Sequence, residues 1–174
     1  MIDHYQGVYP KIHDSVFLAK NAVINGDVTI DEDSSIWFHV VIRGDIAPTR
    51  IGKRVSIQDL TVLHQSPDNP LIIEDDVTVG HQVTLHSAII RKNALIGMGA
   101  IILDGAEIGE NAFVAAGSLV PPGKKIPPNT LYMGNPAKYA RDLTAADYQE
   151  MERVRKSYVE KGQYYKIHTD LGKK

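Results

Sequence analysis

The sequence predicts an all-β fold, a parallel β-helix in which short strands wind into stacked coils, followed by one C-terminal α-helix. A large aliphatic residue recurs at every sixth position over most of the 174 residues. A small or β-branched residue follows four positions after most of these aliphatics, as at Val16, Ala22 and Val28. The interruptions of this period all fall at the same corner of the predicted coil. A repeat this short predicts a solenoid whose coils share one core.

Three six-residue units make one coil, with the aliphatic residue pointing inward and the small residue at the corner. This predicts about six coils. Their first aliphatic residues are Ile12, Ile30, Ile51, Ile73, Ile90 and Ile108. The period lengthens around residues 48–50 and 66–70 and shortens between Leu85 and Ile90. With this grouping all three interruptions fall at the same corner, which an ordinary sandwich of strands would not require.

The C-terminal part departs from the period. The turn Gly134–Lys138 leaves the coils, and Thr144 with Asp147 resembles a capping box at a helix start. Tyr148, Met151, Val154 and Tyr158 then follow helical spacing. We therefore predict a β-helix domain over residues 1–135, and a second region over residues 136–174 whose helix, at about 145–164, packs on the outside of the coils.

Composition excludes several classes of protein. Hydrophobic residues make up 43%, charged residues 23%, and the net charge is −2, so no basic surface for nucleic acid or anionic membrane is expected. Cysteine is absent, which excludes disulfides and thiolate ligands. Residues 1–10 do not resemble a signal peptide, and no apolar run approaches the roughly 20 residues of a membrane span. We expect a cytoplasmic protein.

The segment from Leu63 to His86 holds three of the seven histidines, His64, His81 and His86. His64 and His86 each follow the inward residue on the third side of successive coils, so we expect their imidazoles to stack and project outward. Imidazole nitrogen is a preferred ligand of zinc. The three histidines therefore predict a metal site, although surface residues or a structural histidine ladder would also fit this pattern.

His81 lies on the second side of the coil, two places after Val79, where it should stack over Asp59. Around a threefold axis, the second side of one copy would meet the third side of the next. His81 could then complete the site of a neighbouring copy in a homotrimer, with Trp37 and Phe38 at the buried seam. The other histidines, expected at the surface or in packing, are His4, His13, His39 and His168.

The sequence resembles the γ-class carbonic anhydrase family of the hexapeptide-repeat superfamily over nearly its whole length. The matching segments are Val41–Asp45, Ile57–Asp59 with His64, Gly80–His81 with His86, Gly134–Lys138 and the C-terminal helix. The resemblance implies a left-handed coil, against the general right-handed preference of crossovers. It also implies a trimer whose interfaces hold Zn²⁺, or Fe²⁺ or Co²⁺, between two histidines of one subunit and one of the next.

The implied activity is that of a lyase, in which a metal-bound hydroxide converts carbon dioxide to bicarbonate. By resemblance Gln58 contacts hydroxide or substrate, Arg43 pairs with Asp45 across the interface, and Tyr158 lies at the site mouth. Asp59 is expected to fix the tautomer of His81.

The sequence departs from the best-characterised members in two places. The loop Ser66–Pro70 is shorter than their acidic loop, and Ile46 stands where they have glutamate. The alternatives are an acyltransferase or a metal-dependent thioesterase acting on a coenzyme-A thioester, and a silent metal-stabilised binding protein.

Overall fold

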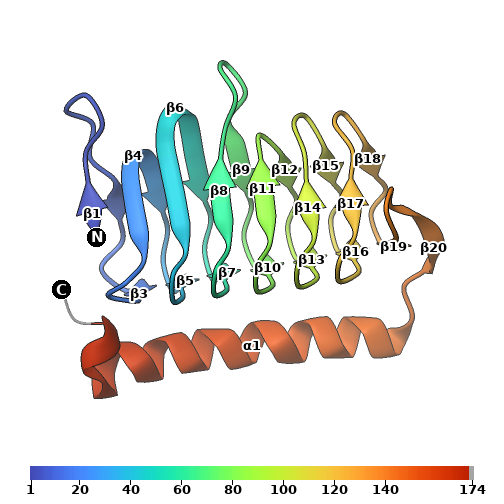
Figure 1. Cartoon of the computed structure of the whole chain (residues 1–174). Coiled ribbons are helices and arrows are strands. Elements are labelled where there is room, and N and C mark those ends of the chain that lie inside the picture. Colours follow the sequence, from blue (N-terminus) through green and yellow to red (C-terminus); the bar gives the residue numbers. More distant parts are fainter. Residues whose placement is uncertain (173–174) are drawn as a thin grey trace.

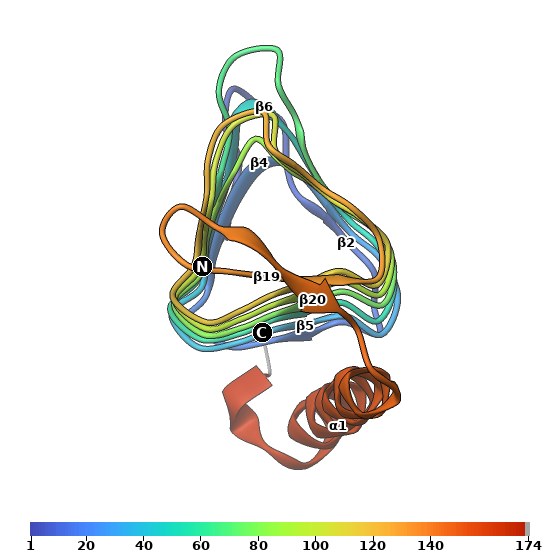
Figure 2. The same ribbon diagram turned by 90° about the vertical axis from the view of Figure 1, so that its right-hand side faces the viewer.

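The computed structural model describes residues 1–172 and shows a left-handed parallel β-helix of about seven coils. Seen end-on, the coils form a three-sided prism and wind clockwise as the chain advances toward the viewer (Figure 2). The predicted fold class is confirmed. The structure has more coils than the six predicted, because a strand is added at each end. Ile2–Asp3 pairs with the strand containing Ile24 at the N-terminal end. At the other end, Ile126 begins a further coil, whose second-side strand pairs with the strand containing Val114.

The strands of each side stack in parallel register. The first side contains the strands β2 (Lys11–Ile12), β9 (Leu71–Ile73), β12 (Ile89–Ile90), β15 (Glu107–Ile108) and β18 (Lys125–Ile126). The second side contains β3 (Phe17–Leu18), β5 (Ser35–Ile36), β7 (Ser56–Ile57), β10 (Thr78–Val79), β13 (Leu95–Ile96), β16 (Phe113–Val114), β19 (Thr130–Met133) and the antiparallel β20 (Lys138–Asp142). The third side contains β1 (Ile2–Asp3), β8 (Val62–His64), β11 (Thr84–His86), β14 (Ile101–Ile102) and β17 (Leu119–Val120).

Inward aliphatic side chains fill the prism and form one continuous core. Ile42, Leu63, Leu85 and Ile102 follow one another up the third side, and each is fully buried. Full burial of such a side chain contributes about 1.5–3 kcal/mol relative to its exposure. The core therefore fixes the register, and the register fixes which outward residues lie above one another.

The third and first sides join through continuous strands in the early coils. β4 (Val23–Ile30) and β6 (Val41–Ile51) run around this corner, which places both sides in one 12-stranded sheet. The two strands approach so closely that a Cβ on Gly44 would lie 2.6 Å from the carbonyl oxygen of Asp27. The predicted interruptions all lie at this apex, where the loop 66–70 protrudes beyond its neighbours (green in Figure 2).

Helix α1 (Ala145–His168) lies along the second side and runs back toward the N-terminal coils (Figures 1 and 2). Its predicted capping box is present, since Thr144 and Asp147 each bond the other's backbone. The helix continues one turn beyond the predicted end, to a short 3₁₀ helix η1 (Asp170–Gly172). Packing on the outside of the coils is confirmed by Met151 and Gly162, which are buried against the prism.

None of the helices within residues 1–172 combines the length and apolar character needed to cross a membrane.

Candidate metal centre

His64 and His86 lie side by side on the third side of the prism. β8 and β11 pair in parallel with these two residues directly opposite each other. Their ring centroids are 5.2 Å apart, and Nδ1 of His64 lies 3.1 Å from Nε2 of His86. The expected stacking of the two imidazoles is therefore confirmed, and it follows from the buried pairing of Leu63 with Leu85 beneath them.

Each imidazole also contacts a carboxylate through its other nitrogen. Nε2 of His64 lies 3.1 Å from Oδ1 of Asp45, and Nδ1 of His86 contacts Oδ1 of Asp104 at short range. A hydrogen bond from the Ser66 hydroxyl at 2.6 Å holds the pKa of Asp104 below its ordinary value, and the bond from His86 lowers it further. Both carboxylates thus accept an N–H from a histidine.

This arrangement determines which nitrogens are free. A neutral imidazole that donates its N–H to a carboxylate presents a bare lone pair at its second nitrogen. Nδ1 of His64 and Nε2 of His86 then face each other as two lone pairs 3.1 Å apart. Two nitrogens bound to one tetrahedral zinc ion lie about 3.4 Å apart, since each is about 2.0–2.1 Å from the metal. The donor pair therefore fits a shared metal ion, which would remove the lone-pair repulsion.

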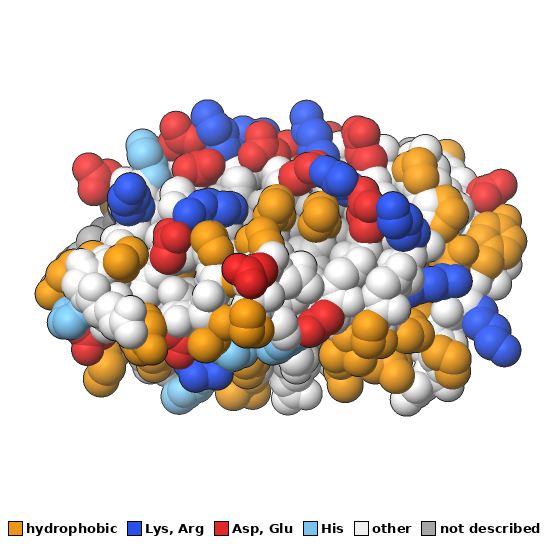
Figure 3. Space-filling model, turned by 90° about the horizontal axis from the view of Figure 1, so that it is seen from above, with side chains coloured by type: hydrophobic (Ala, Val, Ile, Leu, Met, Phe, Trp, Pro, Cys, Tyr) orange, Lys and Arg blue, Asp and Glu red, His pale blue; other side chains and the backbone are white. Residues whose placement is uncertain are grey.

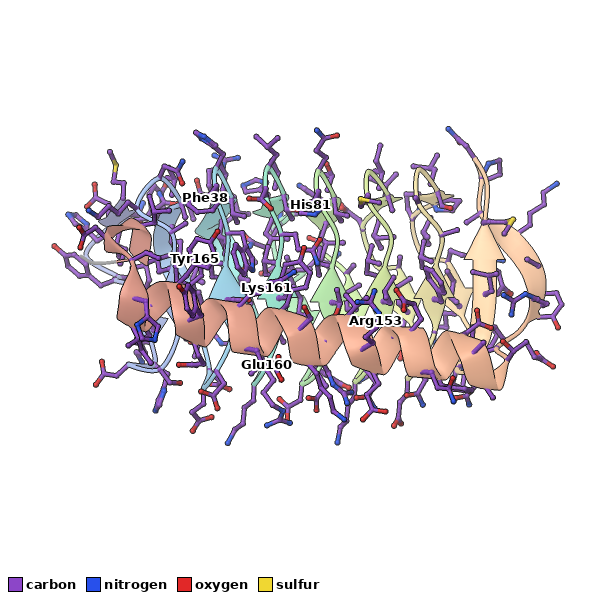
Figure 4. The ribbon with its side chains drawn as sticks, turned by 90° about the horizontal axis from the view of Figure 1, so that it is seen from below. Phe38, His81, Arg153, Glu160, Lys161 and Tyr165 are labelled. Atoms are coloured by element: carbon purple, nitrogen blue, oxygen red, sulfur yellow. The ribbon has the colours of Figure 1, made fainter. Side chains whose placement is uncertain are left out.

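His81 lies apart from this pair, at the edge of the second side beside α1 (Figure 4). Its Nδ1 is 2.8 Å from Oδ2 of Asp59, and its Nε2 is 3.4 Å from the hydroxyl of Tyr158. The expected stacking of His81 over Asp59 is confirmed. Within residues 1–172 of one chain, no three His, Cys, Asp or Glu side chains gather closely enough to hold a metal.

Tyr158 and Gln58 line one cavity together with His81. Burial raises the pKa of the Tyr158 hydroxyl, and the negative charge of Asp59 adds to the rise, so this hydroxyl remains a hydrogen-bond donor at neutral pH. Gln58 is only 4% exposed and lines a cavity between the second side and α1, together with His81 and Tyr158. The polar groups around His81 therefore come from both the prism and the helix.

One prediction about the surroundings is wrong. Trp37 and Phe38 do not form a free seam, because the Trp37 ring packs 5.4 Å from those of both Tyr158 and Tyr165 on α1. Phe38 lies against the same aromatic cluster, 6.2 Å from Tyr165 (Figure 4).

Within its own chain Arg43 lies 3.1 Å from Asp45, and pairing across a subunit interface stays a prediction. The four remaining histidines make only local contacts, as expected. These contacts are His4 with Tyr9, His13 with Ser15, His39 with Asn21 and His168 with Tyr164.

Asp104 and Ser66 were missed by the sequence analysis. Asp104 lies two residues after Ile102, one coil above His86 on the same side of the prism. The repeat therefore predicts that Asp104 lies one coil above His86. It does not predict that the carboxylate of Asp104 turns back toward the coil below. Ser66 was treated only as part of a shortened loop, although its hydroxyl holds Asp104.

Comparison with known proteins agrees with the fold. A family model for the bacterial transferase hexapeptide, described as six repeats, matches residues 9–44 and 87–122. A Geobacillus kaustophilus protein named carbonic anhydrase is 70% identical over 95% of this chain and 91% of its own length. A Bacillus subtilis protein named as an uncharacterized transferase is 71% identical over 96% of this chain and 98% of its own.

A crystal structure from Bacillus cereus, whose name proposes an acetyltransferase, has a TM-score of 0.95. It is 66% identical to this chain and covers 95% of it and 96% of its own length. The names of the relatives thus divide between carbonic anhydrase and transferase. Identity at this level over nearly the whole chain shows common family membership, and the chain belongs to the γ-class carbonic anhydrase-like proteins of the hexapeptide-repeat superfamily.

Proposed function

We propose that this protein is a γ-class carbonic anhydrase that converts carbon dioxide and water reversibly to bicarbonate and a proton. The observation that carries the proposal is the facing pair of ring nitrogens on His64 and His86, whose rings each contact a carboxylate through the other nitrogen. Zn²⁺, or Fe²⁺ or Co²⁺ in its place, would be held by this pair and by His81 of a neighbouring copy. When bound, such an ion supplies the Lewis acidity that makes water nucleophilic near neutral pH.

The neighbouring residues orient these ligands and receive the substrate. Asp45, Asp104 and Asp59 each hold the N–H of one histidine, which keeps the ligating nitrogens bare. The Gln58 amide can donate a hydrogen bond to a substrate oxygen beside His81. The Arg43 side chain is half exposed next to Asp45, where its positive charge favours the bicarbonate anion.

A homotrimer is part of this proposal, and an apolar column on the third side supports it. Outward residues at one register position along this side are mostly aliphatic, with Thr84 between Val62 and Ile101. Val23, Val62 and Ile101 are 36%, 41% and 41% exposed. Figure 3 shows hydrophobic side chains gathered along this edge, whereas charged side chains line the opposite one. A second copy that covers the column would lie directly beside His64 and His86.

Mixed trimers test the shared site. His81→Ala and His86→Ala should each abolish metal binding and carbon dioxide hydration when every subunit carries the change. In an equal mixture, a site is intact only where a His81→Ala subunit supplies the pair and a His86→Ala subunit supplies His81. About a quarter of the sites should then recover hydration activity in stopped-flow assays, with about a quarter of the metal content.

His13→Ala is the matched control, because this exposed histidine lies outside the candidate metal centre and its ring bonds Ser15. It should leave metal content and hydration unchanged. Inactive mixed trimers, or a wild-type protein that is monomeric in solution, would contradict the proposal.

Acyl transfer from a coenzyme-A thioester is the second candidate, and the transferase names of close relatives favour it. A histidine paired with a carboxylate is also a suitable general base. Chelation separates the two functions, since hydration requires the metal. Acetyl transfer that survives chelation, in a protein without hydration activity, would favour the second candidate.

A further inference from the structure

The corner within residues 85–90, where the six-residue period loses one residue, turns at a serine in a strained conformation. Ser87 directly follows the candidate ligand His86, is 1% exposed and has a left-handed φ of +46°. At the same corner of the next two coils, Gly105 and Gly123 hold the left-handed position. Glycine adopts this conformation without a steric cost, whereas serine does not. A serine at this turn therefore indicates that its hydroxyl has a role of its own.

The Ser87 hydroxyl closes the loop 66–70 at its base. It accepts a hydrogen bond from the backbone N–H of Ser66 at 2.7 Å and donates one to the carbonyl oxygen of Asn69 at 2.8 Å. The N–H of Asn69 in turn donates to the carbonyl oxygen of Ser66 at 3.3 Å. One buried hydroxyl therefore bonds both ends of a loop from the coil below and fixes them relative to Ser87.

The backbone of Ser87 bonds the coils that carry the other parts of the candidate metal centre. Its N–H donates to the carbonyl oxygen of His64 at 3.1 Å, and its carbonyl oxygen accepts from the N–H of Gly105 at 2.7 Å. Gly105 directly follows Asp104, whose carboxylate contacts His86. Ser87 thus joins the coil below, which carries His64, to the coil above, which carries Asp104.

The fixed loop reaches His86 through two further side chains. The Ser66 hydroxyl donates to Oδ2 of Asp104 at 2.6 Å, and Oδ1 of the same carboxylate contacts Nδ1 of His86. The direction of the Ser66 hydroxyl depends on the Ser66 backbone, which Ser87 holds. The direction of the carboxylate decides which nitrogen of His86 keeps its proton. These contacts form a ring that starts at Ser87 and ends at the histidine next to it.

We propose that Ser87 is a positioning residue for His86, and that it acts through the loop 66–70 by orienting Ser66 and Asp104. The shortened corner and the protruding loop then serve one purpose, which is to keep Nε2 of His86 bare. The inference rests on the proposed function for the metal ion that this nitrogen would bind. The tautomer of His86 exists without any metal, so it can be tested separately.

The tautomer of His86 in the chelated full-length protein tests this inference. Long-range ¹H–¹⁵N correlation spectra at about pH 8, well above the ordinary imidazole pKa of about 6.5, show which ring nitrogen carries the proton. Ser87→Gly keeps the left-handed turn and removes the hydroxyl, and Ser66→Ala removes the bond to Asp104. The wild type should show only the Nδ1–H tautomer, whereas both variants should show two tautomers in exchange.

Ser34→Gly is the matched control. Ser34 is also 1% exposed, and its hydroxyl donates to the carbonyl oxygen of Gly52 at 2.8 Å and accepts from the N–H of Val55 at 2.9 Å. It lies at the corner between the first and second sides, away from the candidate metal centre. Ser34→Gly should lower the thermal midpoint at least as much as Ser87→Gly, because it loses two similar bonds without relieving a strained turn. It should leave the His86 tautomer unchanged.

Ser66→Thr returns a hydroxyl to the loop and should restore the single tautomer that Ser66→Ala loses. A wild-type tautomer in both Ser87→Gly and Ser66→Ala would overturn the inference. An equal disturbance in Ser34→Gly would overturn it as well, since any buried serine would then have the same effect.

Metal affinity gives a second readout and separates this inference from the proposed function. Competition with a chromophoric chelator should show Zn²⁺ binding about threefold to tenfold weaker in Ser87→Gly and Ser66→Ala, and unchanged in Ser34→Gly. Affinity within twofold of the wild type in both variants would overturn the positioning role. A tautomer that both variants disturb, in a protein that does not hydrate carbon dioxide, would support the inference and refute the carbonic anhydrase activity. Hydration with an undisturbed tautomer in both variants would refute the inference alone.

Discussion

The third and first sides of the prism are built from the same repeat but present different surfaces. Both bury a ladder of aliphatic residues, such as Leu85 on the third side and Ile90 on the first, with no exposed area in either. Outside, the third side carries the histidine pair and the apolar column. The first side instead carries charged side chains, which line the upper edge of Figure 3. They include an ion-pair ladder in which Arg91 bonds Glu74 at 2.8 Å and Glu107 at 2.6 Å.

This difference shows that the fold and the function are specified by separate positions. The inward residues set the coil and its register, and they are interchangeable between sides. The outward residues make no contribution to the shared core, so each side can carry its own chemistry. Substitutions at matched positions on the two sides should therefore agree inside the prism and differ outside it.

The largest expected effect concerns the interior. Leu85→Ala and Ile90→Ala should each lower the free energy of unfolding by about 2–5 kcal/mol, because both leave a cavity in the same close-packed core. Urea denaturation of the chelated protein at fixed concentration measures both. Leu85→Met, which conserves volume, should cost less than about 1.5 kcal/mol. A loss confined to one side would show that the two interiors are not equivalent.

Outward isoleucines should distinguish the sides. Ile101→Glu on the third side would bury an unpaired charge in the proposed trimer interface and should raise the dissociation constant of the trimer about a hundredfold. Ile89→Glu makes the same change on the first side and should leave assembly intact. Sedimentation velocity over a dilution series measures both. Dissociation of the trimer by Ile89→Glu, with no effect of Ile101→Glu, would place the interface on the first side and contradict the proposal.

The carboxylates should also differ between the sides. Asp104→Ala should weaken metal affinity about 10–100-fold, since His86 loses the group that fixes its tautomer, and Asp104→Asn should fall between this variant and the wild type. Glu107→Gln on the first side should have no effect. Competition with a chromophoric chelator measures the affinity. An unchanged affinity in Asp104→Ala would show that Asp104 has no positioning role.

The smallest effect is expected from the ion-pair ladder. Arg91→Ala should lower the free energy of unfolding by about 0–1 kcal/mol at low salt, and by less at 1 M salt. Hydrogen bonding to Arg91 lowers the pKa of Glu107, so the ladder is fully formed above the ordinary carboxyl pKa of 4.5. Its contribution is lost as the pH falls through the lowered value. Chemical denaturation at several pH values measures this contribution, and a loss well above about 1 kcal/mol in Arg91→Ala would contradict the prediction.

Much of the fold was predictable because one short period fixes it. Once the inward residues are known, the third-side pairing of His64 with His86 follows without any knowledge of loops. The position of α1 does not follow, since nothing in the repeat indicates which side the helix covers. Trp37 and Phe38 were misassigned for this reason. Asp104 was missed for a different reason. It lies at a corner of the coil, where the direction of a side chain depends on the local backbone conformation and not on the repeat.

Helix α1 starts beside the last coils and ends beside the first. Near its C-terminal end, Gln163 donates a hydrogen bond to Asp33, and Lys166 donates to the carbonyl oxygen of Val16. In a bare solenoid each coil is stabilised only by its neighbours, so the terminal coils can fray independently. Here a helix that follows all the coils in the sequence fastens the first of them. These early coils should therefore stay open to proteolysis until α1 has formed and packed against them.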